Sequence, residues 1–193
     1  MSAWQWAVLE LIGLFALARG LEVFSSLARA RAAREEQGVQ VFKEPGWGQM
    51  VLTHVAIFVG SAASVILGPT VPGRPLAMAA LVILALATAL RAWMLLSLGG
   101  RWSVLVIDPG DVVTTGPYRF IRHPNYLAIV LEVAALPLVA GAYGVAAWGT
   151  LANALVLARR IPFEERFLAA RFRAYREVMM KRPRFLPRLV ARS

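Results

Sequence analysis

Polar side chains that could form a ligand site gather in one short stretch of the sequence. Residues 118–126 include two tyrosines, two arginines and a histidine, and an apolar run follows directly. A second polar stretch, residues 159–165, follows a later apolar run and holds two arginines and a pair of glutamates. Guanidinium groups and carboxylates form charge-assisted hydrogen bonds, so the two stretches together could hold a polar ligand. Taken singly, each arginine or tyrosine is also compatible with a role as an interfacial anchor beside a membrane.

The elements that position these stretches are apolar helices. Hydrophobic residues make up 59% of the 193-residue chain and charged residues 17%, and the mean hydropathy is +0.61. Soluble domains are about half apolar and a quarter charged, so this composition indicates a membrane protein. A helix needs roughly 20 apolar residues to cross a bilayer. We therefore predict an all-α integral membrane protein with five transmembrane helices, over residues 4–27, 50–67, 76–98, 126–140 and 145–158.

The fourth and fifth spans are predicted to form a short hairpin. The apolar run that contains them is too long for one crossing, and Gly141 and Gly144 interrupt it. Glycine favours turns, which places the break there. Because the two spans of a hairpin begin and end side by side, the polar stretches 118–126 and 159–165 are expected to converge on one site.

The lysines and arginines set the predicted orientation. Successive loops and termini hold none, four, one, three, none and eleven of them. Positive charge is in excess in cytoplasmic segments, which places the N-terminus outside and both the loop 99–125 and the tail 159–193 in the cytoplasm. The prediction is a single multi-pass membrane domain over residues 1–193, in an inner or plasma membrane, with a basic amphipathic helix in the tail.

Composition also excludes several classes of function. The net charge of +10 lies between apolar runs and in the tail, so we expect contacts with membrane lipids and not with nucleic acid. The chain has no cysteine and only two histidines, His54 and His123, which excludes thiolate metal sites, and we expect no metal site. Small residues in the spans permit homo-oligomers without predicting one.

The order of residues in the first stretch resembles a family signature. The string G-P-Y-R-F-I-R-H-P-N-Y, from Gly116 to Tyr126, is similar to that of the isoprenylcysteine carboxyl methyltransferase family, which includes membrane phospholipid methyltransferases. The family pattern continues with an acidic pair and spaced aromatics, here E-E-R-F-L-A-A-R-F-R-A-Y, and a basic end, K-R-P-R-F-L-P. The resemblance covers residues 99–187. It departs from the family at Tyr175, where Phe-Arg-Ala-Tyr replaces Phe-Gly-x-x-Tyr.

The resemblance implies a methyltransferase with S-adenosylmethionine as donor, entering from the cytosol, and a lipophilic acceptor entering from the bilayer. A carboxylate suits the ribose hydroxyls or the amino group of the donor, and tyrosine faces suit its sulfonium by cation–π attraction. Position by position, the family's donor contacts correspond to Gly110, Asp111, Val112, Val113, Tyr118, His123, Pro124, Asn125, Tyr126 and Glu164.

The acceptor is expected to meet arginine. The family's acceptor-contacting arginine corresponds to Arg160, and either Arg160 or Arg122 could orient an acceptor carboxylate. Arg160 precedes Glu164 by four residues, so a surface ion pair between the two is the alternative interpretation.

Three ionisable residues fall inside predicted spans, where they are costly and usually functional: His54, Arg91 and Glu132. An acceptor hydroxyl would benefit from a base. We consider Glu132 as that base or as a group that orients the acceptor. The alternative is a structural ion pair between Glu132 and Arg91.

The predicted function is an S-adenosylmethionine-dependent O-methyltransferase, with Arg122, Glu132 and Arg160 as catalytic residues. Its acceptor is an isoprenylcysteine-type carboxylate or, as in some members of a small bacterial branch of the family, the hydroxyl of a long-chain alkylpyrone or alkylresorcinol. The alternatives are a phospholipid N-methyltransferase and a non-catalytic binding or scaffold protein that uses the same hairpin.

Overall fold

Five long helices form most of the protein in a computed structural model that describes residues 1–37, 41–42, 46–68, 72–103, 106–107 and 112–187. The long helices are α1 (Ala3–Gln37), α2 (Trp47–Leu67), α3 (Arg74–Leu98), α4 (Pro124–Val139) and α5 (Tyr143–Arg171). The shorter elements are α6 (Arg173–Glu177), the 3-10 turns η1 (Gly99–Arg101), η2 (Gly116–Arg119) and η3 (Met179–Lys181), and the strands β1 (Val41–Phe42) and β2 (Val106–Ile107), which pair antiparallel. The helical fold class is confirmed.

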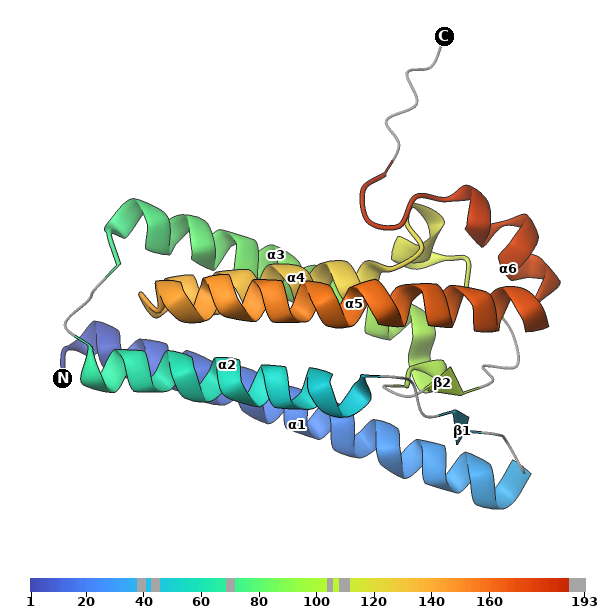
Figure 1. Ribbon diagram of the computed structural model, residues 1–193, viewed down its shortest axis with the longest axis horizontal. Coiled ribbons are helices and arrows are strands. Elements are labelled where there is room, and N and C mark those ends of the chain that lie inside the picture. Colours follow the sequence, from blue (N-terminus) through green and yellow to red (C-terminus); the bar gives the residue numbers. More distant parts are fainter. Residues whose placement is uncertain (38–40, 43–45, 69–71, 104–105, 108–111, 188–193) are drawn as a thin grey trace, which may run out of the picture.

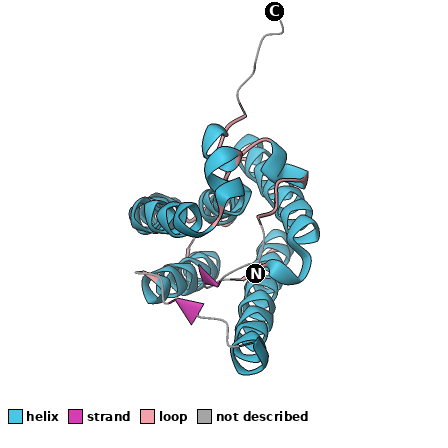
Figure 2. Cartoon of the chain, turned by 90° about the vertical axis from the view of Figure 1, so that its right-hand side faces the viewer, coloured by secondary structure: helices cyan, strands magenta, loops and turns pink. Residues whose placement is uncertain are grey.

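The long helices run in alternating directions. α1 and α2 lie along one side of the molecule and α3, α4 and α5 along the other (Figure 1). The start of α4 and the end of α5 therefore lie at the same end of the bundle, where α6 is also found (Figure 1). Viewed along the bundle, the helices surround a central region (Figure 2).

α4 is the interior helix. All of its residues are described, and every side chain from Pro124 to Val139 is buried or half-buried. The neighbouring helices instead expose large apolar side chains, such as Phe24 on α1, Leu96 on α3 and Leu151 on α5. An exposed apolar surface of this extent indicates that lipid surrounds the bundle.

Among the described residues, two segments are long and apolar enough to cross a membrane, Trp47–Leu67 and Arg74–Arg101. Only 28% of the most apolar window of each is buried, whereas the core helix of a soluble protein would be mostly buried. α4, with 16 residues, is about 24 Å long and too short to cross a bilayer on its own. The number of crossings and the orientation of the termini therefore stay predictions.

The predicted hairpin is present, and its turn lies at residues 140–142. The Ala142 N–H donates to the Pro137 carbonyl at 2.8 Å, and Gly141 has a φ of 70°, a left-handed conformation that glycine adopts without strain. α5 begins at Tyr143, so Gly144 is helical and not part of the turn.

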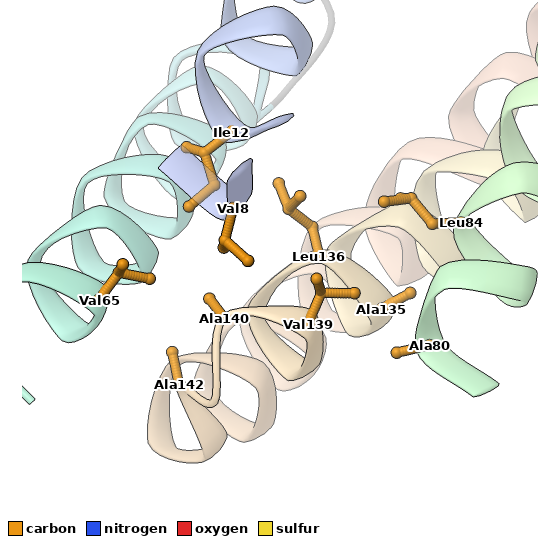
Figure 3. Close-up of a cluster of buried hydrophobic side chains, with 10 residues drawn as sticks. All are labelled: Val8, Ile12, Val65, Ala80, Leu84, Ala135, Leu136, Val139, Ala140 and Ala142. Carbon is orange, nitrogen blue, oxygen red and sulfur yellow. The ribbon is translucent and has the colours of Figure 1, made fainter. Parts of the chain in front are cut away.

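A core cluster joins four helices at the hairpin end of the bundle. Val8 and Ile12 of α1 and Val65 of α2 face Leu136 and Val139 of α4 (Figure 3). On the other side of α4, Ala80 of α3 lies in the same cluster as Ala135, and these small side chains let the two helices approach closely (Figure 3).

Two helices are longer than the membrane spans predicted within them, and the prediction of one amphipathic helix in the tail is wrong. α1 and α5 extend to Gln37 and Arg171, well beyond the predicted spans 4–27 and 145–158, because arginine, glutamate and alanine continue a helix as readily as apolar residues do. The tail is not one amphipathic helix. Extended backbone at Phe172 ends α5, and after α6 and η3 the chain continues without helix through the prolines at 183 and 187.

Candidate functional site

A glycine-dependent turn positions the segment before α4. Gly116 has a φ of 60°, and an added Cβ would lie 2.0 Å from the Ser97 hydroxyl of α3, so a larger residue would displace the turn. Tyr118 follows within η2 and packs against the cluster of Met94 and Trp102. The G-P-Y part of the motif thus fixes Tyr118 against α3.

The tail crosses the start of α4. The backbone N–H groups of Arg122 and His123 donate to the carbonyls of Pro183 and Arg184 at 2.9 and 3.0 Å. Arg182 donates from the tail to the carbonyls of Thr114 and Tyr118. These bonds satisfy backbone groups next to a helix N-terminus, where the helix itself supplies no acceptor.

Glu165 joins two arginines and a histidine in what we call the Glu165 cluster: Arg122, His123, Glu165 and Arg184. Its carboxylate accepts from His123 Nε2 at 3.0 Å and from Arg184 Nη2 at 2.7 Å, and Arg122 Nη1 lies 3.1 Å away. Burial would raise the pKa of Glu165, but the two hydrogen bonds and the charge of Arg122 outweigh it and lower the pKa to about 2. The cluster ties α4, α5 and the tail together.

Glu164, the adjacent residue, takes part in a second set of contacts. The Tyr126 hydroxyl donates to Glu164, and Arg160 Nε donates to the Tyr126 hydroxyl at 2.9 Å. The Arg160 guanidinium also lies 5.7 Å from the centre of the Tyr126 ring and reaches Met50 Sδ of α2 at 2.9 Å. Arg160 and Glu164 are therefore not an isolated surface ion pair, because Tyr126 lies between them and Arg160 is buried.

Both sets border one cavity of about 730 Å³. At its polar end lie Tyr118, Tyr126, Arg160, Glu164 and Tyr175. Its remaining wall is largely apolar but also holds the charged side chains of Arg19, Glu22 and Arg91. The apolar residues that α1 and α2 contribute include exposed ones: Phe24, Leu27, Val55 and Val59. The cavity thus combines polar side chains of α4 and α5 with an apolar wall to which α1 and α2 contribute.

Tyr175 has a buried hydroxyl with no hydrogen-bond partner among the described residues. Burial raises its pKa, and the charges of Glu164 and Glu165 raise it further. The phenol therefore stays neutral and keeps a donor to offer at the polar end. The departure from the family's Phe-Gly-x-x-Tyr pattern leaves Tyr175 in the cavity wall.

A third set of charges lies deeper in the bundle, and we call Arg19, Glu22, Arg91 and Glu132 the Arg19 cluster. Arg19 lies 2.9 Å from Glu22 and 3.6 Å from Glu132. Arg91 bonds Glu22 through two nitrogens and donates to the Asn125 side chain at 2.9 Å. Glu132 and Arg91 therefore do not form the ion pair considered as the alternative. Each pairs instead with a residue of α1, Glu132 with Arg19 and Arg91 with Glu22.

The structure places most predicted site residues together. Nine of them line the cavity: Val112, Val113, Tyr118, Arg122, His123, Asn125, Tyr126, Arg160 and Glu164. Pro124 and Glu132 are buried and are not among the described residues that line it. Gly110 and Asp111 lie outside the described residues.

Comparison with known proteins gives the family. The profile of the isoprenylcysteine carboxyl methyltransferase (ICMT) family matches residues 78–170. Uncharacterized protein YpbQ of Bacillus subtilis (strain 168) is 31% identical over 161 residues, which are 82% of this chain and 94% of YpbQ. This chain belongs to the isoprenylcysteine carboxyl methyltransferase family. The resemblance noted in the sequence is confirmed.

Two further relatives of the ICMT family align with about half of the chain. The cobalt-zinc-cadmium resistance protein CzcN of Cupriavidus metallidurans is 36% identical over 104 residues, 54% of this chain and 45% of CzcN. The nickel-cobalt-cadmium resistance protein NccN of Alcaligenes xylosoxydans xylosoxydans is 33% identical over 104 residues, 54% of this chain and 46% of NccN. Within the described residues of this chain, no group of three or more His, Asp or Glu is placed to hold a metal ion.

Sequence reasoning missed several residues of the site, among them Arg19, Glu22 and Arg184. The match to the ICMT profile begins at residue 78 and ends at 170, so neither α1 and α2 nor the tail is part of it. A usable signal existed for α1, because Arg19 and Glu22 are three residues apart inside an apolar run, where a charge needs a partner.

Proposed function

We propose that the protein is a membrane O-methyltransferase that uses S-adenosylmethionine and acts on a lipophilic acceptor. The observation that carries the proposal is the cavity, which combines polar side chains of α4 and α5 with an apolar wall on α1 and α2. Membership of the ICMT family supports methyl transfer as the reaction. A polar methyl donor and an apolar acceptor need a polar and an apolar surface next to each other in one cavity.

The residues at the polar end fit the donor. The cavity volume lies within the roughly 300–1,000 Å³ of ordinary small-molecule sites. Glu164 would accept hydrogen bonds from hydroxyl or amino groups, and the unpartnered Tyr175 hydroxyl offers a neutral donor. The rings of Tyr118 and Tyr126 would face the positive sulfur. When bound, the donor supplies an electrophilic methyl group.

Arg160 would orient the acceptor. It is buried, lines the cavity and is held by the Tyr126 hydroxyl on one side and Met50 on the other. A guanidinium fixed in this way can hold the acceptor oxygen in line with the methyl group and away from water. We assign Arg122 a positioning role, because it pairs with Glu165. We assign Glu132 the role of holding Arg19 in place.

Transfer of label tests this function directly. The full chain, purified in detergent, is given tritiated S-adenosylmethionine and either a farnesylated cysteine derivative or a long-chain alkylresorcinol. We expect label in an organic-soluble product, lost in Arg160→Gln and kept in Arg159→Gln, because Arg159 is exposed and not among the cavity-lining residues. Absence of both transfer and donor binding by calorimetry would contradict the proposal.

The proposed orientation can be tested with single cysteines, because the natural chain has none. Tyr143 begins α5 at the hairpin and is 45% exposed, and Val178 follows α6 and is 38% exposed. In intact cells, we expect a membrane-impermeant maleimide to label Tyr143→Cys and not Val178→Cys. The reverse pattern would contradict an external hairpin and a cytoplasmic tail.

A further inference from the structure

His54 is the histidine that the function above does not use. It lies on α2, one turn after Met50, and its half-buried side chain lines the cavity. Met50 contacts Arg160, so His54 continues the same wall of the cavity beyond the guanidinium that would orient the acceptor. The ring therefore lies on the acceptor side.

A backbone contact fixes which ring nitrogen of His54 can accept a proton. Nδ1 lies 2.8 Å from the Met50 carbonyl oxygen, which can only accept, so Nδ1 carries the hydrogen. In the neutral ring Nε2 is then unprotonated. None of the described residues hydrogen-bonds to Nε2, although the ring borders the cavity.

Three helices that pack against α2 carry charges that act electrostatically on this ring. They are Arg19 on α1, Glu132 on α4 and Arg160 on α5. The charge of Glu132 would stabilise the imidazolium that forms when the ring accepts a proton. A neutral imidazole beside a carboxylate is an arrangement suited to general base catalysis.

We propose that His54 is the general base of the reaction when the acceptor is a hydroxyl, the second of the two acceptor classes considered above. The proposal rests on the methyltransferase function proposed above. The acceptor oxygen forms a bond to the methyl carbon, the carbon–sulfur bond breaks with its electron pair going to sulfur, and the hydroxyl proton moves to His54 Nε2. A carboxylate acceptor is already ionised at neutral pH and would leave His54 without a proton to accept.

Kinetics with a long-chain alkylresorcinol test the assignment. His54→Asn keeps an N–H donor for the Met50 carbonyl and removes the accepting nitrogen. We expect its kcat to fall by about 100-fold or more at neutral pH, with the calorimetric Kd for S-adenosylmethionine within about twofold of wild type. The deficit should shrink as the pH approaches about 10, where a phenol ionises without help.

Thr53→Val is the matched control. Thr53 is the adjacent buried residue, makes the same kind of bond to the preceding turn through the Gln49 carbonyl, and is not among the residues lining the cavity. We expect it to behave as wild type. A His54→Asn enzyme with wild-type kcat, or with the same deficit at every pH, would overturn the proposal.

Nitrogen NMR of the wild-type chain supplies a readout without turnover. The chain has two histidines, so labelled histidine gives two rings, which the His54→Asn spectrum assigns. We expect His54 as the neutral Nδ1–H tautomer, with Nε2 shifting when alkylresorcinol is added alone. The role of His54 would be overturned by an Nε2–H tautomer or by an Nε2 signal that does not move when alkylresorcinol is added. It would also be overturned by a wild-type enzyme that methylates only the farnesylated cysteine. Each of these results would leave the methyltransferase function standing. A protein that neither binds the donor nor methylates either acceptor would overturn the function itself.

Discussion

The Glu165 cluster and the Arg19 cluster are both buried sets of arginines and glutamates, yet their hydrogen bonding differs. Both oxygens of Glu165 accept hydrogen bonds from the side chains around it. In the Arg19 cluster, Arg19 Nε and Glu132 Oε1 are buried and have no hydrogen-bond partner among the described residues. In the Glu165 cluster the buried atom without a partner among the described residues is Arg122 Nε, so the carboxylate itself is fully bonded. A carboxylate bonded at both oxygens holds segments together, whereas an unused carboxylate oxygen near a cavity is expected where a ligand or a reaction needs it. We interpret the Glu165 cluster as structural and the Arg19 cluster as support for the acceptor side of the site.

The largest effect is expected from breaking the Glu165 cluster. Glu165→Ala leaves Arg122, Arg184 and the His123 ring without their shared carboxylate, and removal of one partner of a buried pair costs about 3–5 kcal/mol. Chemical unfolding in detergent measures the change in the free energy of unfolding. Glu177→Ala is the control, because the pair with Arg173 is exposed and is expected to contribute about 0–1 kcal/mol. Equal effects of the two variants would contradict a structural role for Glu165.

Acid should weaken the same cluster. The pKa of Glu165 is lowered from 4.5 to about 2 in the folded protein, so its ionised form stabilises the fold above pH 4.5, and this stabilisation is lost as the pH falls from 4.5 towards 2. Unfolding measured across this range should show wild type losing more stability than Glu165→Gln. Parallel curves for the two proteins would contradict the low pKa.

An intermediate effect is expected at the polar end of the cavity. Glu164→Gln removes the charge that would accept hydrogen bonds from the donor, and such bonds contribute about 1.5–3 kcal/mol. Calorimetry should therefore show an affinity for S-adenosylmethionine roughly 10- to 100-fold lower, with the free energy of unfolding nearly unchanged. Glu177→Gln serves as the control on an exposed carboxylate. An unchanged affinity would remove Glu164 from the donor site.

The smallest effect is expected in the Arg19 cluster. Glu132→Gln keeps the size of the side chain, and Arg19 retains Glu22 as its partner. We expect donor affinity to be unchanged and kcat to fall about tenfold, which corresponds to roughly 1.4 kcal/mol of lost stabilisation for a positive ring at His54. A variant that unfolds, or that loses donor binding together with turnover, would make this cluster structural as well.

The sequence allowed the helices and the convergence of the two polar stretches to be predicted, because both follow from order along the chain. The hairpin brings Tyr126 to Arg160 and Glu164 once its turn is recognised near Gly141. The pairing of Glu22 with Arg91 joins residues 69 positions apart, and no local pattern fixes the rotation of α1 against α3. The path of the tail was also beyond prediction, since Arg184 reaches Glu165 only because Phe172 turns the chain away from the axis of α5.

Photo-crosslinking with two probes tests most directly whether one cavity serves both substrates. An azidoadenosine analogue of S-adenosylmethionine and an alkylresorcinol with a diazirine near the end of its chain are bound together, and the labelled peptides are identified by mass spectrometry. We expect the donor analogue to label residues 112–126 and 160–175, and the alkyl probe to label residues 16–27 and 50–59 of the same molecules. Labelling of the hairpin end by either probe, or mutual exclusion of the two, would contradict a shared cavity.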